Sequence, residues 1–146
     1  MAKFDDCLVA VTSRSFSTNQ FLVKKLKESY PNVSLNLTGK TLKENELVKF
    51  LANADKAIVG IEIIDKDILD QLPKLKLISK YGVGLNNLDL GECEKRNIQI
   101  KFQPGSNKQS VAEFTLLLML NSLRQVHNNK TEIIEGNWTQ AKGQEL

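Results

Sequence analysis

Short apolar runs and helical segments alternate along the first hundred residues, and this alternation restricts the possible folds more than any other feature of the chain. Five runs have the length and apolar character of strands: residues 8–12, 33–38, 56–62, 75–82 and 98–104. Between them, apolar residues recur at helical spacing, for example in residues 19–30 and 43–54. Strands that alternate with helices form a parallel sheet covered on both faces. We therefore predict an α/β domain with a flavodoxin-like, doubly wound, five-stranded parallel sheet over roughly residues 5–104.

The alternation ends after Pro104. Residues 108–127 are expected to form one long helix with Ser106 or Asn107 as its N-cap, and a second helix is expected near residues 129–138. Apolar residues cover nearly every face of the long helix, so another copy of the chain or a further piece of protein must enclose it. The sequence thus predicts a domain over residues 1–104, a helical extension over residues 105–146, and a homodimer formed through residues 108–127.

Composition argues against several classes of protein. The net charge is only +3, and the lysines are scattered with few aromatic residues between them, so a nucleic-acid-binding face is not expected. The apolar run at residues 114–120 is too short to cross a membrane. The first residues lack the pattern of a signal peptide, which favours a cytoplasmic protein with Cys7 and Cys93 as reduced thiols. Their spacing fits neither a metal site nor a disulfide framework, and we assign no metal ligands.

A glycine-containing loop, KYGVGLN, follows the fourth predicted strand. Gly82 and Gly84 leave the backbone bare, so amide N–H groups of this loop can approach an anion. The segment at residues 103–107 follows the fifth strand and leads into the long helix, a second place that favours negative charge. In an open parallel sheet, ligands bind beyond the carboxyl ends of the strands, which makes a small-carboxylate pocket one interpretation. The alternative is that both segments are tight turns, which is the commoner role of isolated glycines.

A resemblance bears on this choice. The stretches LKLISKYGVGLNNLDLGECEKRNIQI, PGSNKQSVAEFTLLLMLNSLRQV and GNW, within residues 75–138, resemble the N-terminal part of the D-isomer-specific 2-hydroxyacid dehydrogenases, in particular their phosphoglycerate dehydrogenase-like members. VGIEIIDKDIL, residues 59–69, is also similar to the third strand and following helix of that family. The resemblance implies a flavodoxin-like domain that binds a 2-hydroxy or 2-oxo acid, with NAD as the cofactor of the family.

The resemblance also implies roles for individual residues. The substrate carboxylate would be held by backbone amides of the loop formed by Tyr81, Gly82, Val83 and Gly84. Asn107 matches an asparagine that lies beside the substrate in some members. Val111 lies near the start of the helix that approaches the nicotinamide side of the cleft.

Three positions depart from the pattern of the family. Asn86 stands where many members have an aspartate, Phe102 where an asparagine often precedes the proline, and Lys108 where a threonine is usual. The side chains around the pocket are therefore expected to differ from those of many members.

The 146 residues contain no Gly-x-Gly-x-x-Gly, because the third glycine after Gly82 and Gly84 would fall at Asn87. The catalytic arginine, glutamate and histidine of the family correspond to positions farther along its chains, so no catalytic residue is assigned. His127 does not match the catalytic position and is expected to be a solvated residue at the end of the long helix. Glu62, Asp65 and Asp67 are interpreted as acidic residues that favour a helix N-terminus and not as an acid pair.

Two hypotheses follow. In the first, the chain is the substrate-binding domain of an NAD-dependent D-2-hydroxyacid dehydrogenase, truncated before its nucleotide-binding domain, inactive alone and not expected to bind NAD by itself. In the second, it is a non-catalytic binding or oligomerisation module that retains the fold. The long helix would in either case form a homodimer or join a dehydrogenase partner.

Overall fold

The computed structural model of the protein describes residues 6–138 and 142–145. Two compact units follow one another along the chain, Met1–Pro104 and Gly105–Leu146.

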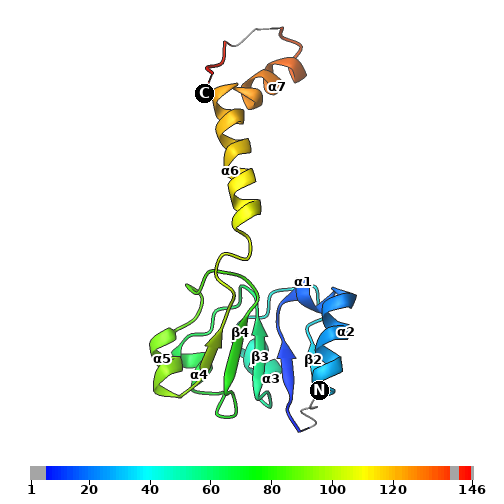
Figure 1. Ribbon diagram of the computed structural model, residues 1–146, viewed down its shortest axis with the longest axis vertical. Helices are drawn as coiled ribbons and strands as arrows, with labels where there is room; N and C mark the ends of the chain where they lie inside the picture. The colour runs from blue at the N-terminus through cyan, green and yellow to red at the C-terminus, as the bar shows by residue number, and fades with distance from the viewer. Residues whose placement is uncertain (1–5, 139–141, 146) are drawn as a thin grey trace. The chain divides into compact units, whose positions relative to one another are not determined.

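The first unit is built around a parallel sheet of five strands in the order β2-β1-β3-β4-β5 (Figure 1). The strands are β1 Val9–Val11, β2 Val33–Leu35, β3 Lys56–Val59, β4 Leu77–Lys80 and β5 Gln99–Lys101. This order is that of flavodoxin-like folds, so the predicted fold class is confirmed. Each strand is shorter than the apolar run that predicted it, because residues at the carboxyl ends leave the sheet to form loops.

Side chains that accept backbone hydrogen bonds start most of the helices in the first unit. These helices are α1 Arg14–Ser17, α2 Gln20–Ser29, α3 Glu44–Leu51, α4 Lys66–Leu69 and α5 Leu90–Lys95. Ser13, Asn19, Asp65 and Asp89 each accept a hydrogen bond from the amide three residues later, as N-caps do. The single turn α1 was not predicted, because four residues are too few to show a helical period.

Helix α5 ends in a Schellman motif. The amide of Ile98 donates to the carbonyl of Cys93 at 2.8 Å, and the amide of Asn97 donates to the carbonyl of Glu94 at 2.9 Å. Asn97 adopts a left-handed conformation with a φ of 56°, which asparagine tolerates better than most residues. Ile98 and Cys93 are both in the hydrophobic core, so the motif directs the chain from α5 into β5.

The core lies between the sheet and helices α3, α4 and α5. Ala57 and Val59 of β3 and Ile78 of β4 point into it, and Leu47 of α3 is 1% exposed. Burial of one such leucine contributes about 2 kcal/mol. The alternate residues of β1, Val9 and Val11, are buried without joining this cluster, as expected for the opposite face of a sheet.

An arginine joins α4 to α5 at the surface. The Arg96 guanidinium donates to Asp70 Oδ1 at 2.5 Å and to Glu92 Oε2 at 3.1 Å. Hydrogen bonds from Lys66 and Arg96 lower the pKa of Asp70, and hydrogen bonds from Lys95 and Arg96 lower the pKa of Glu92.

The second unit contains helices α6 Lys108–Leu123 and α7 Val126–Ile134. The prediction that one helix extends to His127 was wrong. Arg124 caps α6 by donating its amide to the carbonyl of Leu120, and Gln125 adopts a left-handed conformation with a φ of 51° that interrupts the helix. His127 therefore lies in the first turn of α7, where its side chain is exposed.

Large apolar side chains of α6 are exposed. Seven of them lie between 40% and 59% exposed: Val111, Phe114, Leu116, Leu117, Leu118, Met119 and Leu120. Asn107 is the N-cap of α6, although its side chain accepts no capping hydrogen bond. Within the described part of the chain, no helix combines the length and apolar character needed to cross a bilayer.

Candidate functional site

The glycine loop begins where β4 ends. The amide of Tyr81 donates to the carbonyl of Val59 at 2.8 Å and so continues the pairing between β3 and β4. Consequently this amide is not available to a ligand, and Tyr81 can contribute only its side chain. The Tyr81 ring packs edge-on against the ring of Phe16, with 5.4 Å between the ring centroids.

The next three residues leave their backbone amides free. In residues 6–138 and 142–145, no hydrogen bond is donated by the amides of Gly82, Val83 or Gly84. Gly82 and Gly84 are exposed, and Gly82 has a φ of 144°, a conformation that residues with a Cβ rarely adopt. Three consecutive amides without partners at the end of a parallel strand can bind an anion such as a carboxylate.

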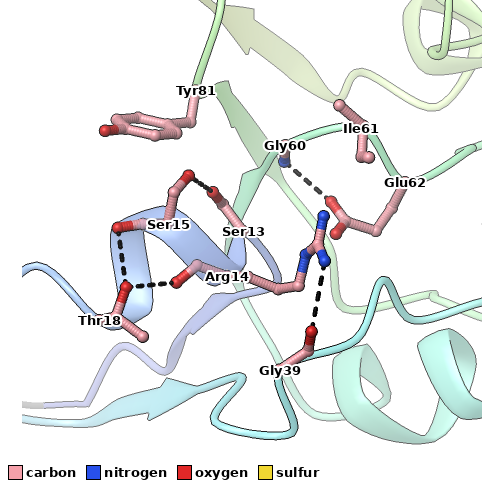
Figure 2. Close-up of a pocket in the computed structure, with 9 residues that line it drawn as sticks. All are labelled: Ser13, Arg14, Ser15, Thr18, Gly39, Gly60, Ile61, Glu62 and Tyr81. Carbon is pink, nitrogen blue, oxygen red and sulfur yellow. Dashed lines mark hydrogen bonds between the residues drawn. The ribbon is translucent and has the colours of Figure 1, made fainter. Parts of the chain in front are cut away.

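A cavity of about 430 Å³ opens beside this loop, at the carboxyl ends of β1 and β3 (Figure 2). It is lined by Ser13, Arg14, Ser15, Thr18, Gly39, Gly60, Ile61, Glu62 and Tyr81. In the strand order β2-β1-β3-β4-β5, the direction of winding reverses between β1 and β3. Loops diverge at such a switch point, and ligands of doubly wound proteins bind there.

Glu62 forms a buried wall of the cavity and is only 2% exposed. Its Oε2 accepts a hydrogen bond from the Thr12 hydroxyl at 2.8 Å. The same oxygen accepts from the Gly60 amide at 2.9 Å (Figure 2). The interpretation of Glu62 as a residue of a helix N-terminus was wrong, because α4 begins only at Lys66, with Asp65 as its N-cap. The carboxylate instead turns back and binds the ends of β1 and β3.

The other polar groups of the cavity come from the segment after β1. Arg14 donates from Nη1 to the carbonyl of Gly39 at 3.3 Å, and the hydroxyls of Ser13 and Ser15 lie 3.3 Å apart. The Thr18 hydroxyl donates to the carbonyl of Arg14 at 3.1 Å. A guanidinium and several hydroxyls can bind a polar or anionic group.

Two side chains connect the loops that follow β3 and β4. Lys80 Nζ donates to the carbonyl of Gly60 and to Asn87 Oδ1, the latter at 2.7 Å. Asn87 Nδ2 donates to the carbonyl of Glu62 at 2.6 Å and to that of Gly60 at 3.3 Å. Partial burial lowers the pKa of Lys80, and the negative charge of Glu62 acts in the opposite direction.

The remaining predicted site residues lie in the second unit. Asn107 precedes α6, and Val111 lies in its first turn and is 53% exposed. Their participation in a site with residues 82–84 stays a prediction. Among the described residues there is no group of three histidine, cysteine, aspartate or glutamate side chains placed to hold a metal ion.

Sequence reasoning missed most of the cavity. It applied the rule of ligand binding at strand ends to β4 and β5 and not to β1 and β3, where the switch point lies. Ser13 and Arg14 come two and three positions after the end of β1, and Gly60 directly follows β3, so the same rule could have found all three. The network of Lys80, Asn87 and Glu62 gives no sequence signal, because it depends on contacts between separate loops.

Comparisons with known proteins indicate the family of this chain. The family described as "D-isomer specific 2-hydroxyacid dehydrogenase, catalytic domain" matches residues 9–144. A hydroxypyruvate reductase from Thermotoga maritima is 31% identical over 115 residues, which cover 77% of this chain and 38% of that protein.

Two solved structures are similar in fold. The NAD+-bound 3-phosphoglycerate dehydrogenase of Entamoeba histolytica has a TM-score of 0.72 at 23% identity, over 96% of this chain and 43% of that one. The D-lactate dehydrogenase of Aquifex aeolicus, in complex with NAD and lactic acid, has a TM-score of 0.68 at 25% identity, over 94% of this chain and 41% of that one. The chain thus spans about two fifths of the length of these proteins. Because the family match covers nearly all of its residues, the chain belongs to the D-isomer-specific 2-hydroxyacid dehydrogenases and corresponds to part of their catalytic domain.

Proposed function

We propose that this chain binds the 2-hydroxy or 2-oxo acid substrate of an NAD-dependent D-2-hydroxyacid dehydrogenase, with the first unit as the substrate-binding domain. The observation that carries the proposal is the row of free amides at Gly82, Val83 and Gly84. They occur at the end of a central parallel strand, in a loop without side chains at two of its three positions. The substrate carboxylate accepts hydrogen bonds from these amides.

The residues around the loop orient the rest of the substrate. Tyr81 lines the cavity and adjoins Gly82 in sequence, so a ligand held by the amides extends along the tyrosine ring. Arg14 and Ser15 also line the cavity and offer hydrogen-bond donors that bind a polar group of the substrate. No residue of this chain is assigned a proton-transfer step.

NAD supplies the hydride chemistry of the related dehydrogenases, and the residues of the first unit do not fit it. A dinucleotide fingerprint places its glycines at the N-terminus of a helix, so that the pyrophosphate meets free amides. Here α5 starts only at Leu90, six positions after Gly84, and its N-cap is the carboxylate of Asp89. A carboxylate at that position would repel a diphosphate. Hydride transfer therefore requires a nucleotide-binding domain. In this proposal Asn107 binds the substrate, and Val111, in the first turn of α6, lies on the nicotinamide side of the cleft.

NMR titration of the ¹⁵N-labelled chain with pyruvate tests the proposal. The amide signals of residues 82–84 should move downfield in a saturable manner, because a carboxylate polarises the N–H groups that it accepts from. Gly84→Ala should weaken this binding, since the new Cβ would lie 3.2 Å from Asn86 Oδ1 and partly cover the loop. Gly91→Ala is the matched control, because its Cβ meets nothing closer than 3.6 Å and lies on α5.

Saturable shifts confined to residues outside the loop and the cavity would contradict the proposal, as would equal affinities for the Gly84→Ala and wild-type chains. A second test uses activity. The 146-residue chain, purified free of host dehydrogenases, should not oxidise NADH in the presence of glyoxylate, pyruvate or hydroxypyruvate, and reproducible turnover would refute the need for a second domain.

The exposed apolar surface of α6 favours a second candidate function, an oligomerisation module. Seven large apolar side chains at 40–59% exposure would be costly to leave in water, so α6 pairs with a second copy of the chain or with a dehydrogenase partner. Light scattering at micromolar concentration should detect a dimer, and Leu117→Glu should convert it to a monomer. The control for the negative charge that Leu117→Glu introduces is Lys130→Glu on α7. A wild-type chain that is monomeric with an ordered α6 would contradict this function.

A further inference from the structure

Lys80 occupies an unusual position for a lysine, because its side chain turns inward between two loops. It is the last residue of β4, and its ammonium donates to the carbonyl of Gly60 and to Asn87 Oδ1. Among the described residues, no carboxylate lies within ion-pair distance of this ammonium. The charge is therefore held in place by neutral oxygens and is not neutralised by direct contact.

The lysine side chain passes next to the glycine loop. A Cβ added to Gly82 would lie 3.6 Å from Lys80 Cε, so the aliphatic part of the lysine packs against the first residue with a free amide. A positive charge on the side chain that packs against Gly82 adds to the favourable potential for an anion at this loop, and partial burial reduces its screening by water. Glu62 contributes the opposing negative charge, and hydrogen bonds from Thr12 and Gly60 hold its carboxylate in place.

Lys80 also acts on the relative placement of the two loops. Asn87 accepts the bond from Lys80 while its amide nitrogen donates to carbonyls of Gly60 and Glu62, so a single side chain connects both loops. Backbone bonds reinforce this link, since Ile64 donates to the carbonyl of Asn87 at 2.9 Å and Asp89 donates to that of Ile64 at 2.9 Å. These backbone bonds do not depend on the lysine and should keep the loops together in its absence.

We propose that Lys80 is a positioning residue for the substrate carboxylate: it adds a hydrogen-bonded link between the segments that follow β3 and β4 and places a positive charge next to the loop of residues 82–84. This inference rests on the proposed function of that loop. In this proposal Lys80 makes the site prefer a charged carboxylate over an uncharged group, although the substrate does not need to contact Lys80.

Two ligands of the same shape distinguish an effect of the Lys80 charge from a purely structural effect of this side chain. Pyruvate carries a carboxylate, and pyruvamide replaces it with a neutral amide. NMR titration of the complete chain measures both affinities through the signals of residues 82–84. Lys80→Met and Lys80→Gln should weaken pyruvate binding about tenfold, the size expected for loss of a unit charge at short range in a partly solvated site. Pyruvamide binding should change less than about twofold by the same argument. Lys80→Arg, which keeps the charge, should bind pyruvate nearly as the wild-type chain does.

Each possible result supports or overturns the proposal for Lys80. Selective loss for pyruvate in both uncharged variants, with recovery in Lys80→Arg, supports the proposal. Equal loss for the two ligands assigns Lys80 a structural role alone and overturns it, and so does unchanged binding of pyruvate. Neither equal loss for the two ligands nor unchanged pyruvate binding in the variants affects the proposed function. If the wild-type amides of residues 82–84 do not respond to pyruvate, both this inference and the proposed function are refuted. Amide exchange at Ile64 and Asp89 verifies that the loops remain paired in each variant.

Discussion

Glu62 allows the sharpest test of how the cavity is held together. Glu62→Ala removes the oxygen that receives the Thr12 hydroxyl and the Gly60 amide, whereas Glu62→Gln keeps the side chain's size and one oxygen that can accept both bonds. The two replacements remove the same negative charge. Any difference in stability between them therefore reports the hydrogen bonds and the volume of the side chain.

The expected loss of stability in Glu62→Ala depends on whether each donor has another acceptor. The Thr12 hydroxyl retains a second acceptor, the carbonyl of Ile58 at 3.3 Å, so its loss is partly compensated. The amide of Gly60 is buried and has no other acceptor among the described residues, and such an orphaned donor costs about 1–3 kcal/mol. With the cavity left by the missing side chain, Glu62→Ala should destabilise the first unit by about 2–4 kcal/mol. Glu62→Gln should cost about 1 kcal/mol or less, because burying a neutral amide is easier than burying a carboxylate.

Urea unfolding followed by far-ultraviolet circular dichroism measures both variants. With a slope of about 1–2 kcal/mol per molar urea for a domain of this size, Glu62→Ala should lower the unfolding midpoint by roughly 1–4 M. Equal midpoints for the alanine and glutamine variants would refute the reasoning, because they would mean that the bonds to Thr12 and Gly60 contribute nothing to the fold. An increase in stability in both variants would show instead that relief of the buried charge exceeds the loss of the bonds.

Three further predictions concern the frame around the site. Leu47→Ala should reduce the free energy of unfolding by about 2–5 kcal/mol, because Leu47 is fully packed in the core, and a urea titration in which the loss is below about 1 kcal/mol would contradict this. Asn97→Ala should lower stability by about 1 kcal/mol, since alanine fits the left-handed φ of 56° poorly, whereas Asn97→Gly should not; equal melting temperatures for the two variants would argue against the Schellman motif as a determinant. Arg96 lowers the pKa of both of its carboxylate partners, so its contribution is present above their ordinary pKa values near 4 and is lost as the pH falls through the lowered values. In a pH series of unfolding curves at low salt, Arg96→Met should therefore destabilise the protein at pH 7 and converge with the wild type in acid, and a constant difference down to the lowest pH would oppose this assignment.

Local patterns in the sequence were sufficient for the elements of the first unit other than the single turn α1. The apolar runs marked all five strands, and an acidic residue, Asp65, marked where α4 begins. They could not locate the end of α6, because nothing in a run of good helix formers announces that Gln125 will adopt a left-handed conformation. Backbone conformation at that residue depends on packing around it.

The glycine loop was visible in the sequence because two glycines at the end of an apolar run leave the backbone bare whatever surrounds it. Which of its amides remain free depends on the tertiary structure, because the amide of Tyr81 donates to the carbonyl of Val59 in a neighbouring strand.

The sequence by itself determined the strand and helix order, and through it the parallel sheet, because periodicity and capping act between residues a few positions apart. Only the tertiary structure decided that Asn87 links the Lys80 ammonium to the backbone carbonyl of Glu62, a residue that lines the cavity. Glu62 follows β3, whereas Lys80 ends β4 and Asn87 lies in the loop after it. Glu62 and Lys80 are 18 positions apart in the sequence, so hydrogen bonds between these segments exist only once the sheet has brought them together.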